Sequence, residues 1–338
     1  MQNRLFTNVR KNKVKWVSLI CNLIWVIFLN SLVFSDEIKQ VVIQDDAGRI
    51  ISIQQPFKRI ISLYGAHTEN LCALGIQDQL IGVSPNDHFP NDAKSKPTFS
   101  YHDDPEKFIA AKPDLILIRP MIDRGYAKLF QRLEQFHIQI ASFQPNTIQE
   151  MYAYWLNLGT LTGKKDAAVK MVDSFQKAIE LICNHTQKIP VKKRVYFEAI
   201  HQKMKTFSPD SMAILALTYA GGINLASDAE PVSGTNIANY GKERLLSLGQ
   251  QIDVYLAQQG TMNPISVERI QQEPGFELIK AVQQNQIYIV DEMLVSRPTY
   301  RLLQGILNIG RILYPDVFNS IAQELKHRNI VFKDVLLP

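Results

Sequence analysis

The sequence predicts an α/β protein with two Rossmann-like lobes, each built on a central and mainly parallel sheet, joined by a single long backbone helix. Three observations support this fold class. Short apolar runs alternate with amphipathic stretches in both halves of the 338 residues. The two halves share a local sequence pattern, and one long amphipathic stretch lies between them. Buried strands separated by helices are typical of parallel βα units.

The first half supplies the strands and helices of one lobe. Residues 59–63 (RIISL) read as a buried strand, and residues 67–74 follow as a helix that Gly75 ends. Thr147 and Glu150 have the spacing of a capping box, which predicts the start of another helix. Further strands are predicted at 81–83, 114–118 and 138–143.

The second half repeats this organisation. A strand is predicted at 194–198, and a helix is predicted from Ser208–Pro209 to the glycine pair at 221–222. The segment 105–118 (PEKFIAAKPDLILI) parallels 242–257 (KERLLSLGQQIDVYLA), because each has a glutamate, an apolar helix, an aspartate and a buried strand. Two lobes of similar structure would explain this similarity between the two segments. Further strands are predicted at 253–257 and 286–290.

One helix is predicted to join the two halves. Apolar side chains recur at helical spacing between Asp166 and Lys188, over about six turns, and Pro190 ends the pattern. A helix limits the relative movement of two lobes more than a flexible strand does. The apolar positions are Ala168, Val172, Phe175, Ile179 and Ile182. The predicted domains are an N-terminal lobe at 36–163, a linking backbone helix at 164–189 and a C-terminal lobe at 190–338.

The first 35 residues have the order of a secretory signal peptide. Five basic residues come first, an apolar run extends from Trp16 to Leu29, and the small residues Val33 and Ser35 precede Asp36. We therefore predict a cleavable signal peptide over 1–35. A retained membrane anchor is the alternative, but four polar residues interrupt the apolar stretch and weaken it as a span.

The charge balance argues against a nucleic-acid partner. The net charge of the whole chain is +5, and the five basic residues before Asp36 account for all of it, so the exported chain is neutral. The basic character therefore belongs to the export signal. Only Cys72 and Cys183 remain after cleavage, so a disulfide framework does not hold this protein together.

A series of short motifs resembles the helical-backbone class of periplasmic solute-binding proteins, the receptors for ferric siderophores, cobalamin and haem. Each motif alone is weak, but together they cover nearly the whole exported chain in the right order. The motifs are Asp45–Arg49 with Pro56 and Arg59-Ile60, Thr68-Glu69 with Ala73-Leu74-Gly75, Gly82-Val83, Pro105-Glu106, Lys112–Leu115, Ser296-Arg297-Pro298 with Arg301-Leu302, and Leu313-Tyr314-Pro315.

The resemblance implies a role in import from the periplasm. Proteins of this class bind ligand between their lobes and deliver it to the permease dimer of an ABC importer with its ATPase subunits. It also implies two glutamates, one per lobe, that dock on arginine pockets of the permease; by motif position these are Glu106 and Glu243. The alternative is that each carboxylate only stabilises a helix N-terminus. A monomer without a cofactor of its own is expected.

Residues just after the predicted strands are expected to line the cleft, where α/β sheets generally bind ligands. Arginine pairs with carboxylate or catecholate oxygens and tyrosine covers an organic shell, which favours an anionic chelate of iron or another transition metal. Cobalamin is less favoured, because Tyr101 stands where cobalamin receptors often carry tryptophan. The predicted cleft residues are Tyr64, His67, His88, Tyr101, His102, Arg119, Glu198, His201, Met204, Asn236, Tyr240, Gln259 and Arg297.

The loop histidines leave a second chemistry open, in which imidazole groups ligate a metal ion or the iron of haem directly. Only Glu198 and His201 are closely spaced, so no tight metal-ligand pattern supports this alternative. The candidate metal ligands are His67, His88, His102 and His201, with Glu198 and Met204 beside them.

An enzyme is not expected, because the sequence has no phosphate-binding glycine loop, nucleophile elbow or zinc-protease helix. A periplasmic metal-dependent enzyme that uses His67, His88, His102 and Glu198 is kept as a rival. A membrane-tethered sensor lobe is a third possibility, and it requires the N-terminal segment to remain uncleaved.

Overall fold

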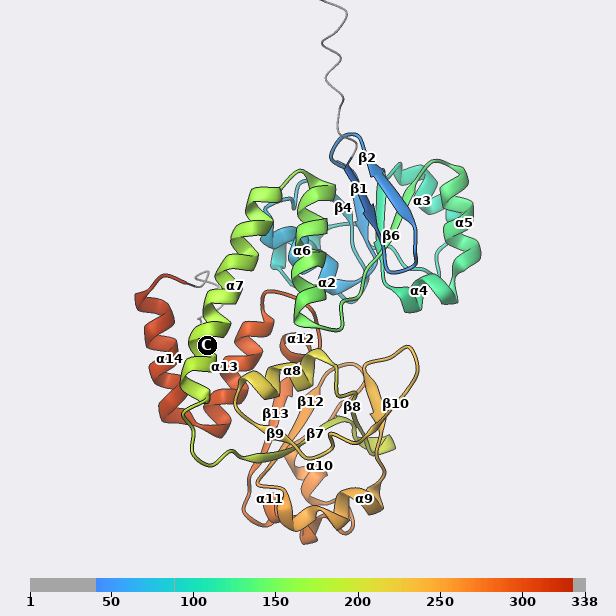
Figure 1. Ribbon diagram of the computed structural model, residues 1–338. Coiled ribbons are helices and arrows are strands. Elements are labelled where there is room, and N and C mark those ends of the chain that lie inside the picture. The colour runs from blue at the N-terminus through green and yellow to red at the C-terminus, as the bar shows by residue number, and fades with distance from the viewer. Residues whose placement is uncertain (1–40, 88, 331–338) are drawn as a thin grey trace, which may run out of the picture. The chain divides into compact units, whose positions relative to one another are not determined.

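A four-stranded parallel sheet forms the centre of the first lobe. The computed structural model describes residues 41–87 and 89–330, whose arrangement is drawn in Figure 1. The strand order is β4-β3-β5-β6, and all three pairs are parallel. The predicted parallel strands of this lobe are confirmed, each to within one residue at either end. They are β3 (Ile60–Ser62), β4 (Leu80–Gly82), β5 (Leu115–Ile118) and β6 (Gln139–Ser142).

Helices alternate with these strands and cover the sheet. Phe108, Phe130 and Leu133 project from α3 and α5 and pack with the apolar side chains of β3 and β5. Thr147 and Glu150 form both hydrogen bonds of a capping box at the start of α6, as predicted. The helices of this lobe are α2 (Gly65–Ala73), α3 (Pro105–Ala111), α4 (Pro120–Gly125), α5 (Ala127–Gln135) and α6 (Ile148–Thr162), with the short 3-10 helix η1 (Asn91–Ser95).

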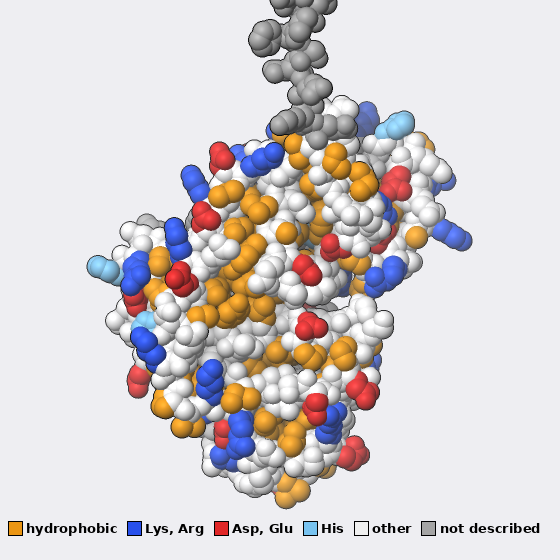
Figure 2. Space-filling model, viewed as in Figure 1, with side chains coloured by type: hydrophobic (Ala, Val, Ile, Leu, Met, Phe, Trp, Pro, Cys, Tyr) orange, Lys and Arg blue, Asp and Glu red, His pale blue; other side chains and the backbone are white. Residues whose placement is uncertain are grey.

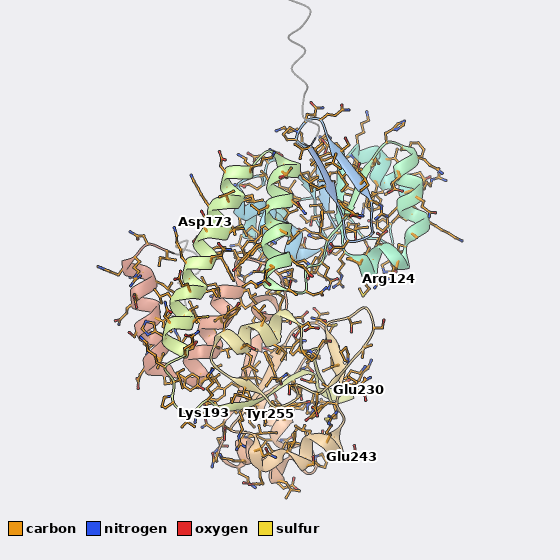
Figure 3. All side chains as sticks on the ribbon, viewed as in Figure 1. Arg124, Asp173, Lys193, Glu230, Glu243 and Tyr255 are labelled. Carbon is orange, nitrogen blue, oxygen red and sulfur yellow. The ribbon has the colours of Figure 1, made fainter. Side chains whose placement is uncertain are left out.

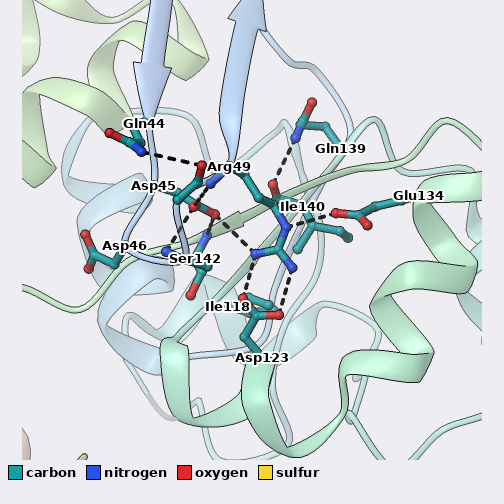
Figure 4. A network of polar contacts seen from close by, with 12 residues as sticks. Gln44, Asp45, Asp46, Arg49, Ile118, Asp123, Glu134, Gln139, Ile140 and Ser142 are labelled. Atoms are coloured by element: carbon teal, nitrogen blue, oxygen red, sulfur yellow. Dashed lines mark hydrogen bonds and ion pairs between the residues drawn. The ribbon is translucent and has the colours of Figure 1, made fainter.

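A separate hairpin of β1 (Val41–Gln44) and β2 (Ile50–Ile53) is joined to this lobe through Arg49. The Arg49 guanidinium donates two hydrogen bonds to Asp123, at 2.6 and 2.8 Å, and one to Glu134 at 2.9 Å (Figure 4). The hydrogen bonds that Arg49 donates to Asp123 raise the pKa of Arg49 further above its ordinary value. Buried Asp45 accepts from the backbone N–H of Arg49 and of Ser142. These contacts attach the hairpin to α4, α5 and the end of β6.

The predicted backbone helix is α7 (Lys165–Thr186), with 22 residues. Its length is about 33 Å at the usual rise per residue. It packs against α6 of the first lobe and against α8 and α14 of the second half. Figure 2 shows charged side chains of both signs interspersed over one face, with apolar side chains gathered across α6 and α7. All five predicted apolar positions of the stripe are buried, namely Ala168, Val172, Phe175, Ile179 and Ile182.

The second lobe is built on a mixed sheet of seven strands. β7 pairs in parallel with β12 and β9, and β12 pairs in parallel with β13. β8, β11 and β10 extend the sheet with antiparallel pairs. The predicted parallel strands are confirmed, but they form only part of this sheet. The strands are β7 (Arg194–Ile200), β8 (Lys205–Phe207), β9 (Ile223–Asn224), β10 (Glu230–Pro231), β11 (Ile237–Asn239), β12 (Val254–Gln259) and β13 (Ile287–Asp291).

The antiparallel part begins at a tight reversal after β7. The chain turns through the 3-10 helix η2 (His201–Lys203), and Met204 then adopts a left-handed backbone with φ of 46°. This conformation is uncommon for a residue with a side chain and is rare for methionine. No glycine or asparagine marks the turn, so local sequence does not predict that the chain returns as β8.

The helix predicted to begin at Ser208–Pro209 begins later, so that prediction is wrong by one turn. The helix is α8 (Met212–Tyr219), and Ser211 is its N-cap residue, with a side chain that accepts from the backbone N–H of Ile214. The Ser208 hydroxyl donates instead to the carbonyl of Ile237 on β11, which removes it from the helix start. Ser208 and Ser211 are both suitable N-cap residues by type. The contact of Ser208 with β11 leaves Ser211 as the residue that caps the helix.

The remaining helices surround the second sheet and the end of α7. α13 packs on α8, and α14 packs on α7 and α13. The helices are α9 (Lys242–Ser247), α10 (Val267–Gln271), α11 (Lys280–Gln283), α12 (Glu292–Val295), α13 (Leu302–Leu313) and α14 (Pro315–His327), with the 3-10 helices η3 (Gly249–Gln251) and η4 (Phe276–Leu278).

The predicted signal peptide over 1–35 lies outside the described residues. Over residues 41–87 and 89–330, no helix combines the length and apolar character needed to cross a membrane. From Val42 onward the described chain forms one compact unit, and the boundaries at 163–164 and 189–190 stay predictions.

Candidate functional site

A cavity of about 340 Å³ lies between the two lobes at the carboxyl ends of their strands. Its first-lobe lining follows β3, β4, β5 and β6, and most of its second-lobe lining follows β12 and β13. Open α/β sheets bind ligands at this edge. Five of the predicted cleft residues line the cavity: Tyr64, Tyr101, Arg119, Asn236 and Arg297.

Arg119 supplies the cavity with a cation that no acidic side chain neutralises directly. No ion pair joins it to an aspartate or glutamate in the described part of the chain, and its buried Nε has no hydrogen-bond partner there. Its guanidinium carbon lies 4.9 Å from the ring centre of Tyr64, which is a cation–π contact. Burial raises the pKa of Tyr64 and outweighs the charges of Arg119 and Arg297, so this ring stays neutral.

Arg297 lines the same cavity but is already paired. Its Nη1 lies 2.8 Å from Glu69 Oε1, and Arg301 Nη1 lies 3.4 Å from the other carboxylate oxygen. The Glu69 side chain is only 2% exposed, and burial raises the pKa of its carboxyl despite the two arginines. Breaking such a buried pair from one side is costly, because it leaves an uncompensated charge. Arg297 is therefore a structural residue as well as a lining residue.

The peptide after Arg297 makes a second connection to the first lobe. The carbonyl of Pro298 accepts hydrogen bonds from Asn70 on α2, at 3.0 Å, and from the Trp155 indole on α6, at 3.2 Å. Both contacts join the segment after β13 to first-lobe helices. The motif residues around Thr68-Glu69 and Ser296-Arg297-Pro298, far apart in the sequence, thus meet at one place.

His67 does not line the cavity. It is fully buried in α2, where Nδ1 lies 2.6 Å from the Tyr154 hydroxyl and Nε2 lies 2.8 Å from the Ile118 carbonyl. Burial lowers the pKa of His67 to about 4, so the ring is neutral at physiological pH. Both nitrogens are occupied, which leaves none for a metal ion.

Glu198 and His201 form a buried pair behind the cavity instead of lining it. Glu198 Oε2 lies 2.7 Å from His201 Nδ1 and accepts a 2.5 Å hydrogen bond from the Tyr255 hydroxyl. Asn263 donates to the other carboxylate oxygen at 3.2 Å. Burial lowers the pKa of His201, but the hydrogen bond and charge of Glu198 outweigh it, so the pKa lies above its ordinary value. Glu273 lies 3.5 Å from the other ring nitrogen.

The remaining predicted cleft residues lie elsewhere. His102 is exposed and contacts the Tyr126 hydroxyl at 3.1 Å. Met204 packs on the second-lobe core, Tyr240 is part of that core, and Gln259 donates to the Ile265 carbonyl. His88 lies outside the described residues. Within 41–87 and 89–330, no cluster of three histidine, cysteine or acidic side chains has metal-binding geometry, and His67, His102 and His201 are not brought together.

Several lining residues were not predicted, although most share the signal that identified the others. They follow strands or sit in the first turn after one, with side chains that turn into the cavity. Glu292, for example, is the first residue of α12, and burial raises the pKa of its carboxyl. The unpredicted polar and sulfur-containing lining residues include Ser84, Met121, Gln144, Met262, Glu292 and Ser296.

The two predicted docking glutamates lie on short helices, one in each lobe. Glu106 is in the first turn of α3 and forms a 2.9 Å ion pair with Arg132 on α5, with both side chains more than half exposed. Glu243 is exposed in the first turn of α9 (Figure 3). Exposed ion pairs contribute little to stability, about 0–1 kcal/mol, so both carboxylates remain available to a partner.

Comparison with known proteins agrees with this architecture. Residues 60–294 match the family described as periplasmic binding protein. An uncharacterized ABC transporter substrate-binding lipoprotein of Bacillus subtilis, YvrC, is 25% identical over 289 residues, covering 84% of this chain and 88% of the relative. The vitamin B12-binding protein of Vibrio vulnificus is 25% identical over 260 residues, covering 76% and 90%.

A solved structure is similar in both fold and sequence. It is a possible iron-binding, periplasmic solute-binding protein from Staphylococcus epidermidis, with a TM-score of 0.67 and 27% identity, covering 77% of this chain and all of that one. The predicted fold class is thereby confirmed. Because the family match spans most of the sequence, the chain belongs to the periplasmic binding protein family, as a substrate-binding component of an ABC transporter and not an enzyme.

Proposed function

We propose that this protein captures an anionic chelate of iron or another transition metal in the cavity between its lobes and delivers it to the permease dimer of an ABC importer. The observation that carries the proposal is Arg119, an unpaired guanidinium beside a neutral tyrosine ring in that cavity. Such a group pairs with carboxylate or catecholate oxygens, and the ring covers an organic shell.

The histidine contacts support a chelated metal over a bare ion. His67 and His201 each direct ring nitrogens at protein groups behind the cavity. A metal ion that already carries its own organic ligands needs no imidazole from the protein. The charge and aromatic surface around Arg119 are then sufficient for recognition.

A corrinoid is the second candidate ligand, and haem is the third. Vitamin B12-binding proteins from Vibrio species are among the relatives, and Met121 and Met262 give the cavity polarisable apolar surface for a large ring. Against a corrinoid, Trp155 is buried and donates to the Pro298 carbonyl, so no tryptophan among residues 41–87 and 89–330 lines the cavity.

Calorimetric titration with ferric enterobactin (a tris-catecholate trianion), cyanocobalamin and haemin tests the proposal. We expect at least one of them to bind, and Arg119→Ala to weaken that binding about 10-fold or more, the usual effect of losing a charge-assisted hydrogen bond. Arg132→Ala, which removes an exposed arginine outside the cavity, is the matched control. Unchanged affinity in Arg119→Ala contradicts an arginine-anchored ligand, and absence of binding by all three compounds contradicts the proposed function.

We further propose that Glu106 and Glu243 dock on the permease. The double variant Glu106→Ala/Glu243→Ala is expected to bind the same chelate normally but to lose stimulation of the importer ATPase in proteoliposomes. The control is Glu180→Ala/Glu277→Ala, which removes two exposed glutamates from α7 and η4. Loss of chelate binding in the docking variant would show that the glutamates act on the cleft instead.

A further inference from the structure

A second cavity, also about 340 Å³, adjoins the first one. The two cavities share Gln144 from the first lobe and Gly234, Thr235 and Asn236 from the second. The space between the lobes is therefore one cleft with two chambers. We name the second the polar chamber; its characteristic side chains are Arg124, Gln144, Asn146, Asp210 and Asn236.

The polar chamber receives side chains from both lobes. Arg124 lies on α4, at the side of the first lobe that faces the second (Figure 3), and Asn146 follows β6. Asp210 precedes α8, and the loop between β10 and β11 supplies Gly234. Gly234 has φ of 72°, and a Cβ atom there would lie 2.8 Å from Arg124 Nη2. The small residue lets this loop approach the other lobe closely.

The two chambers differ in chemistry. The lining of the first chamber includes two tyrosines, two methionines and the unpaired Arg119, beside the paired Arg297 and the carboxylates of Asp87 and Glu292. The tyrosines and methionines are Tyr64, Tyr101, Met121 and Met262. Among the described residues, the polar chamber has no aromatic or sulfur-containing side chain in its lining. It shares the amides of Gln144 and Asn236 with the first chamber and adds that of Asn146, while Arg124 and Asp210 contribute opposite charges. Amides both donate and accept hydrogen bonds, so this surface suits a neutral group that does the same.

The amide and charged groups of the polar chamber are not engaged within the protein. In the described chain, no hydrogen bond or ion pair occupies the side chain of Arg124, Asn146 or Asp210. The nearby serines are different, because Ser208 donates to Ile237 and Ser211 caps α8. Recognition in the polar chamber therefore falls to the amides and to the Arg124 and Asp210 side chains.

We infer that the ligand of this cleft has two chemically different parts: a compact, anionic or π-rich body in the first chamber, and a neutral arm with amide or hydroxyl groups in the polar chamber. The inference rests on the proposed function, since it concerns the same ligand. It favours chelates with a hydrogen-bonding periphery, such as catecholamide siderophores and corrinoids, over haem, which carries no such arm.

The test compares ferric enterobactin, cyanocobalamin and haemin on the wild-type protein and on Arg124→Met/Asn146→Leu. Both positions are exposed and line only the polar chamber. We expect ferric enterobactin or cyanocobalamin to bind more tightly than haemin, and the double variant to weaken that binding about 10-fold through two lost hydrogen-bonding side chains. Lys128→Met/Gln149→Leu makes the same chemical changes at exposed first-lobe positions outside both chambers, and its affinity is expected to stay unchanged.

Two results overturn the inference while the proposed function stands. One is tightest binding of haemin. The other is a double variant with wild-type affinity, when Arg119→Ala still weakens binding of the same compound. If none of the three compounds binds, the proposed function fails and the inference fails with it.

Discussion

Each lobe buries one histidine and one glutamate just behind the cleft, but the two lobes use them in opposite ways. In the first lobe, His67 and Glu69 have separate partners: the histidine contacts Tyr154, and the glutamate pairs with Arg297. In the second lobe, Glu198 and His201 pair with each other. As a result, the pKa of His67 is lowered by burial to about 4, whereas Glu198 raises the pKa of His201 above its ordinary value.

Residue type and position after a strand therefore do not set the role of an ionisable group. Its role is set by the side chain with which it pairs. Glu69 joins the two lobes through its ion pair with Arg297. The Glu198–His201 pair stays within the second lobe and holds Asn263, in the loop after β12, by hydrogen bonds. Each of the following variants changes one side of this comparison.

The largest effect is expected for Glu69→Ala. It leaves Arg297 buried without its partner, so the free energy of unfolding is expected to fall by about 3–5 kcal/mol. Urea denaturation measures this loss. Glu106→Ala, which breaks the exposed pair with Arg132, is the control and is expected to cost no more than about 1 kcal/mol. Equal losses in the two variants would contradict the distinction between the lobe-spanning pair and a surface pair.

The next effect is the pH dependence of His67. Its folded pKa of about 4 lies below its unfolded value, so the unfolded chain binds more protons between the two pKa values, and stability falls as pH drops from about 6.5 to 4. The contribution is about 3 kcal/mol. His67→Gln is expected to be less stable at pH 7 but to lose this part of the pH dependence. If the free energy of unfolding has the same pH dependence in the wild type and in His67→Gln, the lowered pKa of His67 is contradicted.

The smallest effect is expected for His201→Asn, and its pH dependence has the opposite sign. Because the folded pKa of His201 is raised, its stabilisation is full below the unfolded pKa and declines as pH rises through the folded pKa. The difference from wild type is expected to be about 2 kcal/mol at pH 5.5, the value of a charge-assisted hydrogen bond, and to shrink toward pH 8. Thermal unfolding at both pH values, with Tyr255→Phe as a pH-independent control, measures it.

The sequence predicted the elements whose pattern is local. The strands at 60–62 and 115–118 are short apolar runs, and the Thr147–Glu150 capping box depends on two residues one turn apart. The reversal at Met204 has no turn residue that marks it in the sequence. The choice of Ser211 over Ser208 depends on a contact with β11, which is 29 residues away in sequence.

The cleft was predicted in part for a related reason. A position just after a strand brings a residue near the cavity, but the direction of its side chain decides whether the residue lines the cavity. Tyr64 and His67 follow the same strand, yet Tyr64 faces the cavity and His67 turns back toward Tyr154. Arg119 and Arg297 are both arginines that line the cavity. The structure, and not the sequence, shows that Arg297 is already paired with Glu69.

The contact of Pro298 with Asn70 and Trp155 also constrains how the protein can move. The chain crosses between the lobes through α7, and this contact, together with the Glu69–Arg297 pair, holds them at a second place. Two fixed places define an axis, and rotation about an axis is a single degree of freedom. An opening of the cleft that keeps both places intact is therefore limited to rotation about the line that joins them.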